Sequence, residues 1–156
     1  MNGDSERFSL DTNLLVYAID GQGGIKHELA KQIIERAVRC NCCLTLQAVS
    51  EFYAAVTRKR VLPRHEAAAQ AADWLALFPC AAASAGAVRS ALTDATAGRA
   101  SYWDALLVAT AREAGCAVLL TEDLSDETDF GGVRIHNPFS PSGGLNPLAC
   151  RLLGLD

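Results

Sequence analysis

The sequence predicts an α/β fold in which helices cover both faces of a parallel β-sheet. Short apolar runs alternate with longer amphipathic segments along the 156 residues, which is the pattern of repeated β-α units. The run 116–120 is apolar throughout, as expected of a strand that is buried on both faces. Half of the residues are hydrophobic, so the chain can form a full core as one domain.

The expected elements follow one another without an internal repeat or a domain boundary. Apolar residues spaced three and four apart predict the helices, and proline or glycine marks several of their ends. The predicted strands cover 8–10, 42–46, 80–83, 116–120 and, at an edge of the sheet, 133–135. The predicted helices are a short one after residue 11 and then 25–39, 47–60, 63–78, 85–97 and 101–114. Residues 137–146 read as a tail, followed by a small apolar segment at 148–155.

Composition argues against several classes of protein. Acidic residues outnumber basic ones by 18 to 14, so the chain lacks the basic field of a general DNA binder. No apolar stretch resembles a signal peptide or is long enough to span a membrane. We therefore expect a cytoplasmic protein without disulfides. Cys40, Cys42 and Cys43 have no second pair at zinc-like spacing, and we interpret them as small residues in and around a buried strand.

Four acidic residues are predicted to meet at one edge of the sheet. Asp11 and Asp123 each follow an apolar strand, and ligands bind outside the carboxyl ends of such strands. Asp104 lies on the apolar stripe of its helix, so its carboxylate points towards the core side. Ser101 and Asp104 also fit a helix capping box, which would explain this acid without any site. Glu51 lies in the first turns of its helix, just after a strand end, and it is a candidate only because that strand-to-helix junction belongs at the same sheet edge.

This set of acids predicts a metal site for phosphodiester hydrolysis. Clustered carboxylates repel one another, and their ionised forms are stable together only with a cation. Oxygen ligands without histidine or thiolate partners favour Mg²⁺ or Mn²⁺. A hydrated ion of this kind binds phosphate oxygens, positions a water molecule and stabilises the leaving oxygen. The sequence carries no P-loop, Rossmann glycine fingerprint or Ser-His-Asp order.

The local sequence around these acids resembles that of the PIN domain nucleases and, within them, that of the VapC-type toxins of toxin–antitoxin pairs. The resemblance extends from Arg7 to Phe139. Any one of its motifs is short, and their order and spacing together carry the resemblance. The segments that carry it are 10–13, 50–51, 101–107, 114–116, 120–124 and 132–139.

The resemblance implies a three-layer α/β/α sandwich with a central parallel sheet of about five strands. It places a nuclease domain at residues 1–139 and leaves 140–156 as a C-terminal tail that is no separate domain. The implied activity is that of a metal-dependent endoribonuclease, which uses Mg²⁺ or Mn²⁺ to cut RNA. The implied partners are a second copy of the chain in a homodimer and a small antitoxin protein.

The resemblance also assigns roles to residues by position. Asp11, Asp104 and Asp123 would be metal ligands. Glu51 would bind the metal directly or through water. The polar residues beside the site that would orient carboxylates or water are Thr12, Asn13 and Thr121.

Substrate contact has to come from basic residues outside the acidic set. The densest basic run is 58–60 together with Arg64, and most of it is interpreted as solvated helix charge. Arg99 precedes the helix that carries Asp104. It is therefore the best candidate in the sequence for contact with a phosphate.

These residues also bear on three other functions. A receiver domain carries paired acids after its first strand and a late lysine, but Asp11 has no acidic neighbour and no lysine follows Lys59. A phosphatase of the D-x-D type needs an acid where this chain has Asn13. A catalytically silent PIN-like module that binds RNA or a partner stays open, although all four acids are present.

Overall fold

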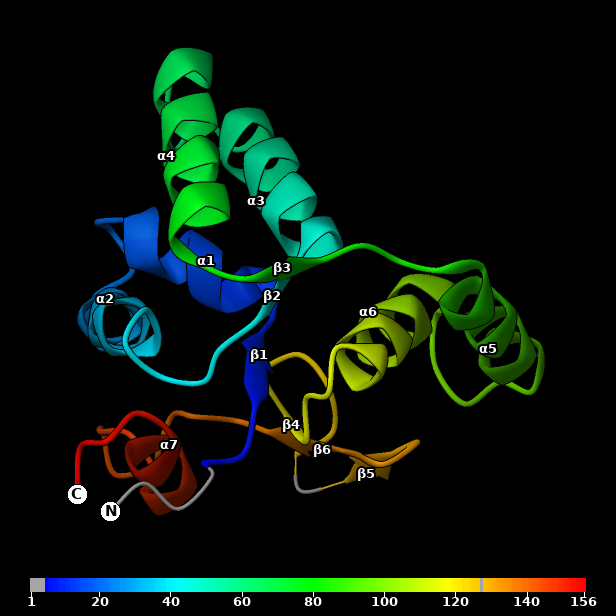
Figure 1. Ribbon diagram of the computed structural model, residues 1–156. Helices are drawn as coiled ribbons and strands as arrows, with labels where there is room; N and C mark the ends of the chain where they lie inside the picture. The colour runs from blue at the N-terminus through cyan, green and yellow to red at the C-terminus, as the bar shows by residue number, and fades with distance from the viewer. Residues whose placement is uncertain (1–4, 127) are drawn as a thin grey trace.

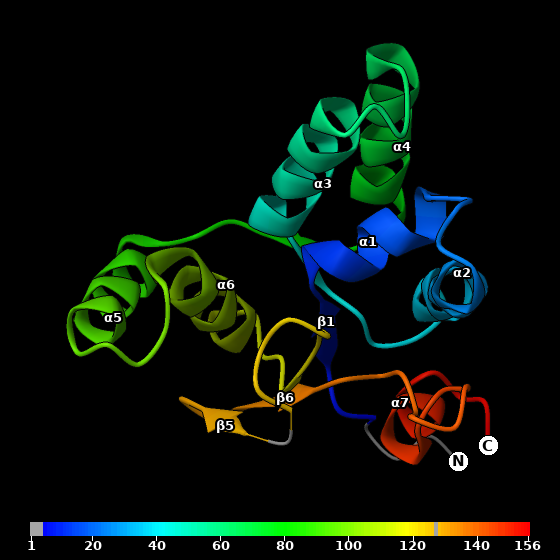
Figure 2. The same ribbon diagram turned by 180° about the vertical axis from the view of Figure 1, so that it is seen from behind.

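A β-sheet runs between two groups of helices in the computed structural model, which describes residues 5–126 and 128–156. Helices α1 and α2 lie on one side of strand β1, and α5 and α6 lie on the other (Figures 1 and 2). Helices α3 and α4 pack against each other and project away from the sheet (Figure 1). This arrangement confirms the α/β sandwich that the sequence predicts.

The elements agree closely with the predicted ones, and their bounds are as follows. The strands are β1 (Phe8–Leu10), β2 (Leu44–Thr45), β3 (Cys80–Ala81), β4 (Val118–Leu120), β5 (Asp129–Phe130) and β6 (Val133–His136). The helices are α1 (Thr12–Ile19), α2 (Ile25–Ala37), α3 (Leu46–Arg58), α4 (Arg64–Leu77), α5 (Ala85–Thr96), α6 (Tyr102–Glu113) and α7 (Pro147–Leu152).

The sheet is mostly parallel and is organised around β1 and β4. These two strands pair in parallel with Leu10 opposite Leu120, so their carboxyl ends lie side by side. Strand β6 continues the sheet in parallel beyond β4. Strands β2 and β3 form a separate parallel pair, which a single bridge between Phe8 and Cys42 links to β1. All residues of β1 and β4 are buried.

The outer edge of the sheet differs from the prediction. Residues 133–135 were expected to form an edge strand, but β5 pairs antiparallel with β6 on its outer side. A two-residue turn of Gly131 and Gly132 joins β5 to β6, and both glycines have positive φ, 60° and 92°. Positive φ at both central positions is the requirement of the hairpin turn that fits twisted strands, and glycine adopts it without steric cost.

The C-terminal segment packs on the core. Asn146 caps the start of helix α7, and its side chain accepts a hydrogen bond from the Ala149 N–H. Leu152 and Leu153 are buried in the same apolar cluster as β1 and β4. The Arg36 guanidinium donates hydrogen bonds to the carbonyl oxygens of Leu153 and Gly154. These contacts fix the segment against helix α2.

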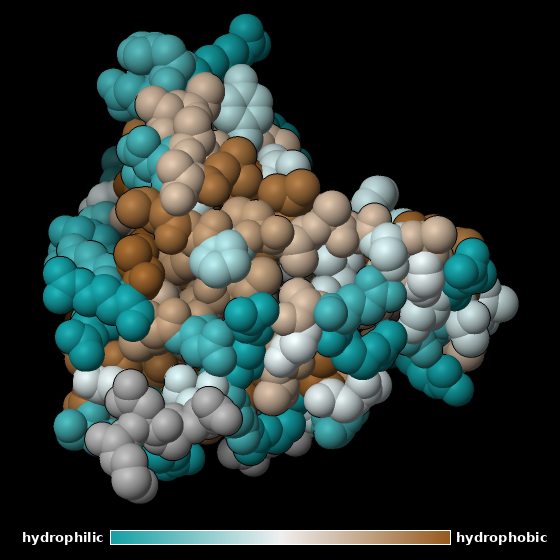
Figure 3. All heavy atoms as spheres, in the orientation of Figure 1, coloured by the Kyte–Doolittle hydropathy of each residue, from teal (hydrophilic) through white to brown (hydrophobic). Residues whose placement is uncertain are grey.

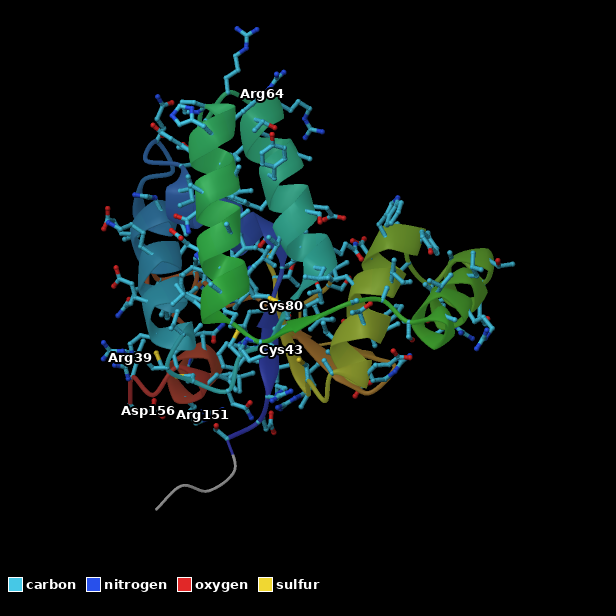
Figure 4. The ribbon with its side chains drawn as sticks, turned by 45° about the horizontal axis from the view of Figure 1, so that its top comes forward. Arg39, Cys43, Arg64, Cys80, Arg151 and Asp156 are labelled. Carbon is cyan, nitrogen blue, oxygen red and sulfur yellow. The ribbon has the colours of Figure 1, made fainter. Side chains whose placement is uncertain are left out.

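Several cysteines lie around β2 and β3. Cys42 and Cys43 are buried just before β2, which confirms their interpretation as small residues in and around a strand. Cys43 lies near Cys80 of the neighbouring strand β3 (Figure 4). Within the described ranges, no helix has the length and apolar character that crossing a bilayer would require.

Candidate active site

The four predicted acids line one cavity of about 530 Å³ at the carboxyl ends of β1 and β4. They come from four separate stretches of the chain: Asp11 from the end of β1, Glu51 from α3, Asp104 from α6 and Asp123 from the loop after β4. The cavity therefore exists only in the folded chain. Thr12 and Asn13 also line it.

Asp11 is the most deeply buried member of the set, with 7% of its surface exposed. One carboxylate oxygen accepts a hydrogen bond from the Thr12 N–H at 2.7 Å, so Asp11 also caps helix α1. The other oxygen accepts from the Thr121 hydroxyl at 2.7 Å. Both hydrogen bonds fix the direction in which the carboxylate points.

Burial raises the pKa of Asp11 to about 6, against the hydrogen bonds from Thr121 and Thr12 that lower it. The negative charges of Asp123 and Asp104 raise this pKa further. A group in this state is ionised at neutral pH only at a cost in free energy, because water has been removed and like charges are near. A cation in the cavity would offset that cost.

Thr121 joins the two strand ends, and its side chain is fully buried. Its hydroxyl donates to Asp11 and accepts from the Asn13 amide at 3.1 Å and from the Asp123 N–H at 3.1 Å. One oxygen atom thus fixes the positions of three neighbouring site residues relative to one another.

Glu51 is held by two donors from opposite directions. The Thr12 hydroxyl donates to one carboxylate oxygen at 3.0 Å. The Gln47 amide donates to the other oxygen at 3.0 Å. Helix α3 therefore presents Glu51 to the cavity in a defined orientation, directly across from the first turn of α1.

Asp104 lies in the first turn of α6, where the sequence also allowed a capping role. The Ser101 hydroxyl accepts a hydrogen bond from the backbone N–H of Asp104 at 3.2 Å. This cap uses only the main chain of residue 104. Within the described residues, the carboxylates of Asp104 and Asp123 accept no hydrogen bond from the protein, so both are free to bind a ligand.

The side walls of the cavity are two helical stripes, of which the sequence analysis assigned only Asn13 and Glu51 to the site. Helix α1 and its C-cap supply Asn13, Val16, Tyr17 and Asp20, and helix α3 supplies Glu51, Ala54, Ala55 and Arg58. Each set follows the spacing i, i+3, i+4, i+7, which places all its members on one helix face. The signal was available in the sequence once Asn13 and Glu51 were taken as starting points.

The basic residues at the cavity do not include Arg99, which the sequence favoured for contact with a phosphate. Arg58 and Lys59 line this cavity, although the sequence favours solvated helix charge for most of the basic run. Arg99 lies outside this cavity, in a smaller hollow that also includes Asp104. Its guanidinium binds the Asp94 carboxylate at 2.8 Å.

The residues present suit a hydrated Mg²⁺ better than a fully protein-ligated ion. Among residues 5–126 and 128–156, no three His, Cys, Asp or Glu side chains are arranged to hold an ion directly. Mg²⁺ keeps several waters and needs only one or two carboxylates from a protein. Asn13 adds a further oxygen, since its buried Oδ1 has no hydrogen-bond partner in the described part of the chain. The donor set is all oxygen, which is the type that Mg²⁺ and Mn²⁺ prefer.

Comparison with known proteins agrees with this geometry. The model of the PIN domain matches residues 9–125, and the chain belongs to the PIN domain family. The resemblance seen in the sequence is thereby confirmed. No curated protein sequence matches the chain.

Solved structures share the fold at low sequence identity. The VapC20 toxin of Mycobacterium tuberculosis, described as cleaving the sarcin-ricin loop, is 19% identical, with a TM-score of 0.59, and the match covers 74% of this chain and 89% of that one. VapBC2 of Rickettsia felis, bound to promoter DNA, is 15% identical, with a TM-score of 0.61 and coverage of 83% and 97%. A toxin–antitoxin complex of Klebsiella pneumoniae is 21% identical, with a TM-score of 0.58 and coverage of 80% and 93%.

Proposed function

We propose that this protein is a metal-dependent endoribonuclease that hydrolyses RNA phosphodiester bonds, as the toxin of a toxin–antitoxin pair. The observation that carries the proposal is the single cavity lined by four carboxylates from four parts of the chain. Membership of the PIN domain family and the VapC neighbours support the same activity.

Asp11, Asp104 and Asp123 would hold the Mg²⁺ or Mn²⁺ ion, with Glu51 bound directly or through water. Such an ion, when bound, lowers the pKa of water and stabilises negative charge on phosphate oxygens. Asp11 is fixed for this task by its two hydrogen bonds, and Thr121 orients it. The free carboxylates of Asp104 and Asp123 can turn towards the ion.

Arg58 and Lys59 are the side chains that would contact the RNA backbone away from the cut. Arg58 follows Glu51 by seven residues on the same face of α3, which is roughly 10 Å along the helix axis. Positive charge at that distance binds a neighbouring phosphate without approaching the acidic end of the cavity. Contacts of this kind strengthen binding and carry no sequence information.

Protein partners would cover the apolar surface of α3 and α4. Figure 3 shows apolar side chains over these helices, where Leu46, Tyr53, Leu75 and Leu77 are exposed. A groove of about 490 Å³ runs between the two helices. We propose that a second copy of the chain, in a homodimer, covers this surface and that a small antitoxin binds near the acidic edge, since the solved neighbours include toxin–antitoxin complexes.

Cleavage of single-stranded RNA by the purified protein tests the activity. We expect cutting with Mg²⁺ or Mn²⁺ and none with chelator, because the carboxylates supply no nucleophile of their own. Asp104→Asn should lower the rate by at least about 100-fold, since even outer residues of metal sites are worth 10–100-fold. The Ser101 cap uses the backbone of residue 104 and survives this change.

Asp73→Asn is the matched control, because Asp73 is exposed on α4 and lies outside the cavity. It should cut RNA at the parent rate. Undiminished cleavage by Asp104→Asn, or cleavage that persists in chelator, would exclude the proposed mechanism.

A catalytically silent module that binds RNA or a partner is the second candidate. The basic side chains of Arg58 and Lys59 at the cavity would bind RNA in the same way without cleavage. It predicts RNA binding without cleavage under every metal condition. The assay above separates the two candidates directly.

A further inference from the structure

A second hollow of about 420 Å³ lies between α3 and α6, beside the acidic cavity. Glu51 lines both spaces. Unlike the acidic cavity, this hollow is mostly apolar, with Trp103 and Leu106 among its lining residues. Its volume lies within the range of about 300–1,000 Å³ that is usual for small-ligand sites.

Trp103 gives the hollow a flat aromatic wall that faces solvent. The indole is 61% exposed, which is unusual for the largest apolar side chain. The Tyr102 ring packs edge-on against it at a centroid distance of 5.0 Å. The Gln47 amide donates to the backbone carbonyl oxygen of Trp103 at 2.9 Å, which ties this turn of α6 to α3.

Gln47 links α3 to α6 at the wall of the hollow. Its NH₂ group donates to two acceptors, the Glu51 carboxylate and the Trp103 carbonyl, and this fixes which end of the amide is nitrogen. The remaining oxygen, Oε1, is buried and accepts no hydrogen bond within the described chain. It has no surface that a ligand in the hollow could contact, so Gln47 contributes to the wall through the link that its NH₂ group makes between α3 and α6.

We propose that this hollow binds one unpaired nucleobase of the RNA, next to the phosphate that is cut; this inference rests on the proposed ribonuclease function. The base stacks on the exposed ring of Trp103. In a duplex both faces of a base are covered by the bases above and below it, so a paired base cannot offer a face to Trp103. The hollow therefore selects single-stranded RNA, where bases can be splayed out and stacked on aromatic side chains.

Position favours a base over a protein side chain as the occupant. Trp103 directly precedes Asp104, and Glu51 is shared between the hollow and the acidic cavity. The two spaces therefore adjoin, and a nucleotide whose phosphate lies in the cavity can place a base in the hollow. Stacking platforms beside a charged groove are also the usual design for single-strand binding.

Binding to RNA tests the proposal apart from catalysis. We would use the Asp123→Asn background with Mg²⁺, which should not cut, and titrate a short single-stranded RNA while recording tryptophan fluorescence. The chain has two tryptophans, and Trp74 is buried, so quenching by RNA reports Trp103. A duplex of the same sequence should quench far less.

Substitutions of Trp103 give the expected magnitude. Trp103→Ala should weaken single-strand binding by roughly 5- to 150-fold, the usual loss for one stacked base. Trp103→Phe should retain most of the affinity because the aromatic face remains. Leu92→Ala, on α5 and also exposed, is the control and should bind like the parent.

The test separates this inference from the proposed function. If the wild-type protein cuts no RNA, yet quenching and its dependence on Trp103 persist, base binding in the hollow is supported and the proposed nuclease activity is contradicted. If the wild type cuts RNA and Trp103→Ala binds and cuts like the parent, the hollow proposal is overturned. It is also overturned if Trp103→Ala instead breaks a dimer in sedimentation while RNA affinity is unchanged.

Discussion

The ends of β1 and β4 follow the same sequence pattern, an apolar strand and then an acid, but they differ in their surroundings. The two strands pair with Leu10 opposite Leu120, so the difference does not arise from position in the sheet. Asp11 is buried and accepts two hydrogen bonds through its side chain. Asp123 is exposed and is held by the protein only through its backbone N–H.

This difference gives the two acids different roles in binding a ligand. Asp11 is placed before any ligand arrives, and its charge is costly because burial raises its pKa. Asp123 is exposed to water, so its carboxylate can adjust to a ligand. One strand end supplies fixed geometry, and the other supplies a carboxylate that can be recruited.

The largest expected effect is on the free energy of unfolding when Asp11 is replaced. Burial raises its pKa from an ordinary 3.8 to about 6, and one unit is worth about 1.4 kcal/mol. The native chain then binds a proton more tightly than the unfolded chain, so Asp11 destabilises the fold as pH rises from about 4 to 6. Without metal, Asp11→Asn should be more stable than the parent by up to about 3 kcal/mol at pH 7 and nearly equal at pH 4.

Urea unfolding in chelator at several pH values measures this effect. Asp123→Asn is the matched control, because it removes an exposed carboxylate from the neighbouring strand end. Added Mg²⁺ should stabilise the parent and should stabilise Asp11→Asn less. A difference between Asp11→Asn and the parent that is the same at pH 4 and pH 7 would contradict the role of burial at this strand end.

The sequence was sufficient for the parts of the site that depend on local pattern. Strand ends followed by Asp11 and Asp123, and the helical stripe of Asp104, are local features, and parallel pairing brings them to one edge. The unequal burial of the two aspartates could not be predicted, because it depends on Thr121 and on packing between distant segments. The hairpin at Gly131 and Gly132 was missed although its glycine pair is a local turn signal.

The place of Arg58 in the cavity was missed for a different reason. Its helix was correctly predicted, and the spacing from Glu51 to Arg58 puts both residues on one helix face. Arg58 could therefore have been placed at the site once Glu51 was assigned there, but the sequence analysis treated the basic run apart from the acids. Arg99, which the sequence favoured for phosphate contact, stays a prediction with its guanidinium bound to Asp94.

Removing the Thr121 hydroxyl should disturb both strand ends at once. Thr121→Val keeps the shape of a fully buried side chain but removes a donor to Asp11 and an acceptor for Asn13 and Asp123. We expect a loss of about 1–3 kcal/mol, the cost of leaving buried polar groups unpaired. The pKa of Asp11 should rise further, because the hydrogen bond from Thr121 lowers it.

Thr110→Val is the control for this change. Thr110 is also buried, but its hydroxyl donates only to the Leu106 carbonyl within α6, so its loss should cost less. Unfolding by urea gives both values, and equal losses would show that Thr121 has no special role at the strand ends.

The smallest expected effect concerns the charge pair that holds the β4 end from outside. Lys26 of α2 binds Glu122, two residues beyond β4, at 2.8 Å, and Tyr17 donates a hydrogen bond to the same carboxylate. Lys26 is 43% exposed, so Lys26→Gln should cost only about 0.2–1 kcal/mol, with less effect at high salt. Lys31→Gln, an exposed change on the same helix, should cost less still. Because Glu122 adjoins Asp123, a rate of RNA cleavage that falls more than the stability loss explains would mean that the β4 end also needs fixed geometry. An unchanged rate would keep Asp123 as the adjustable member of the pair.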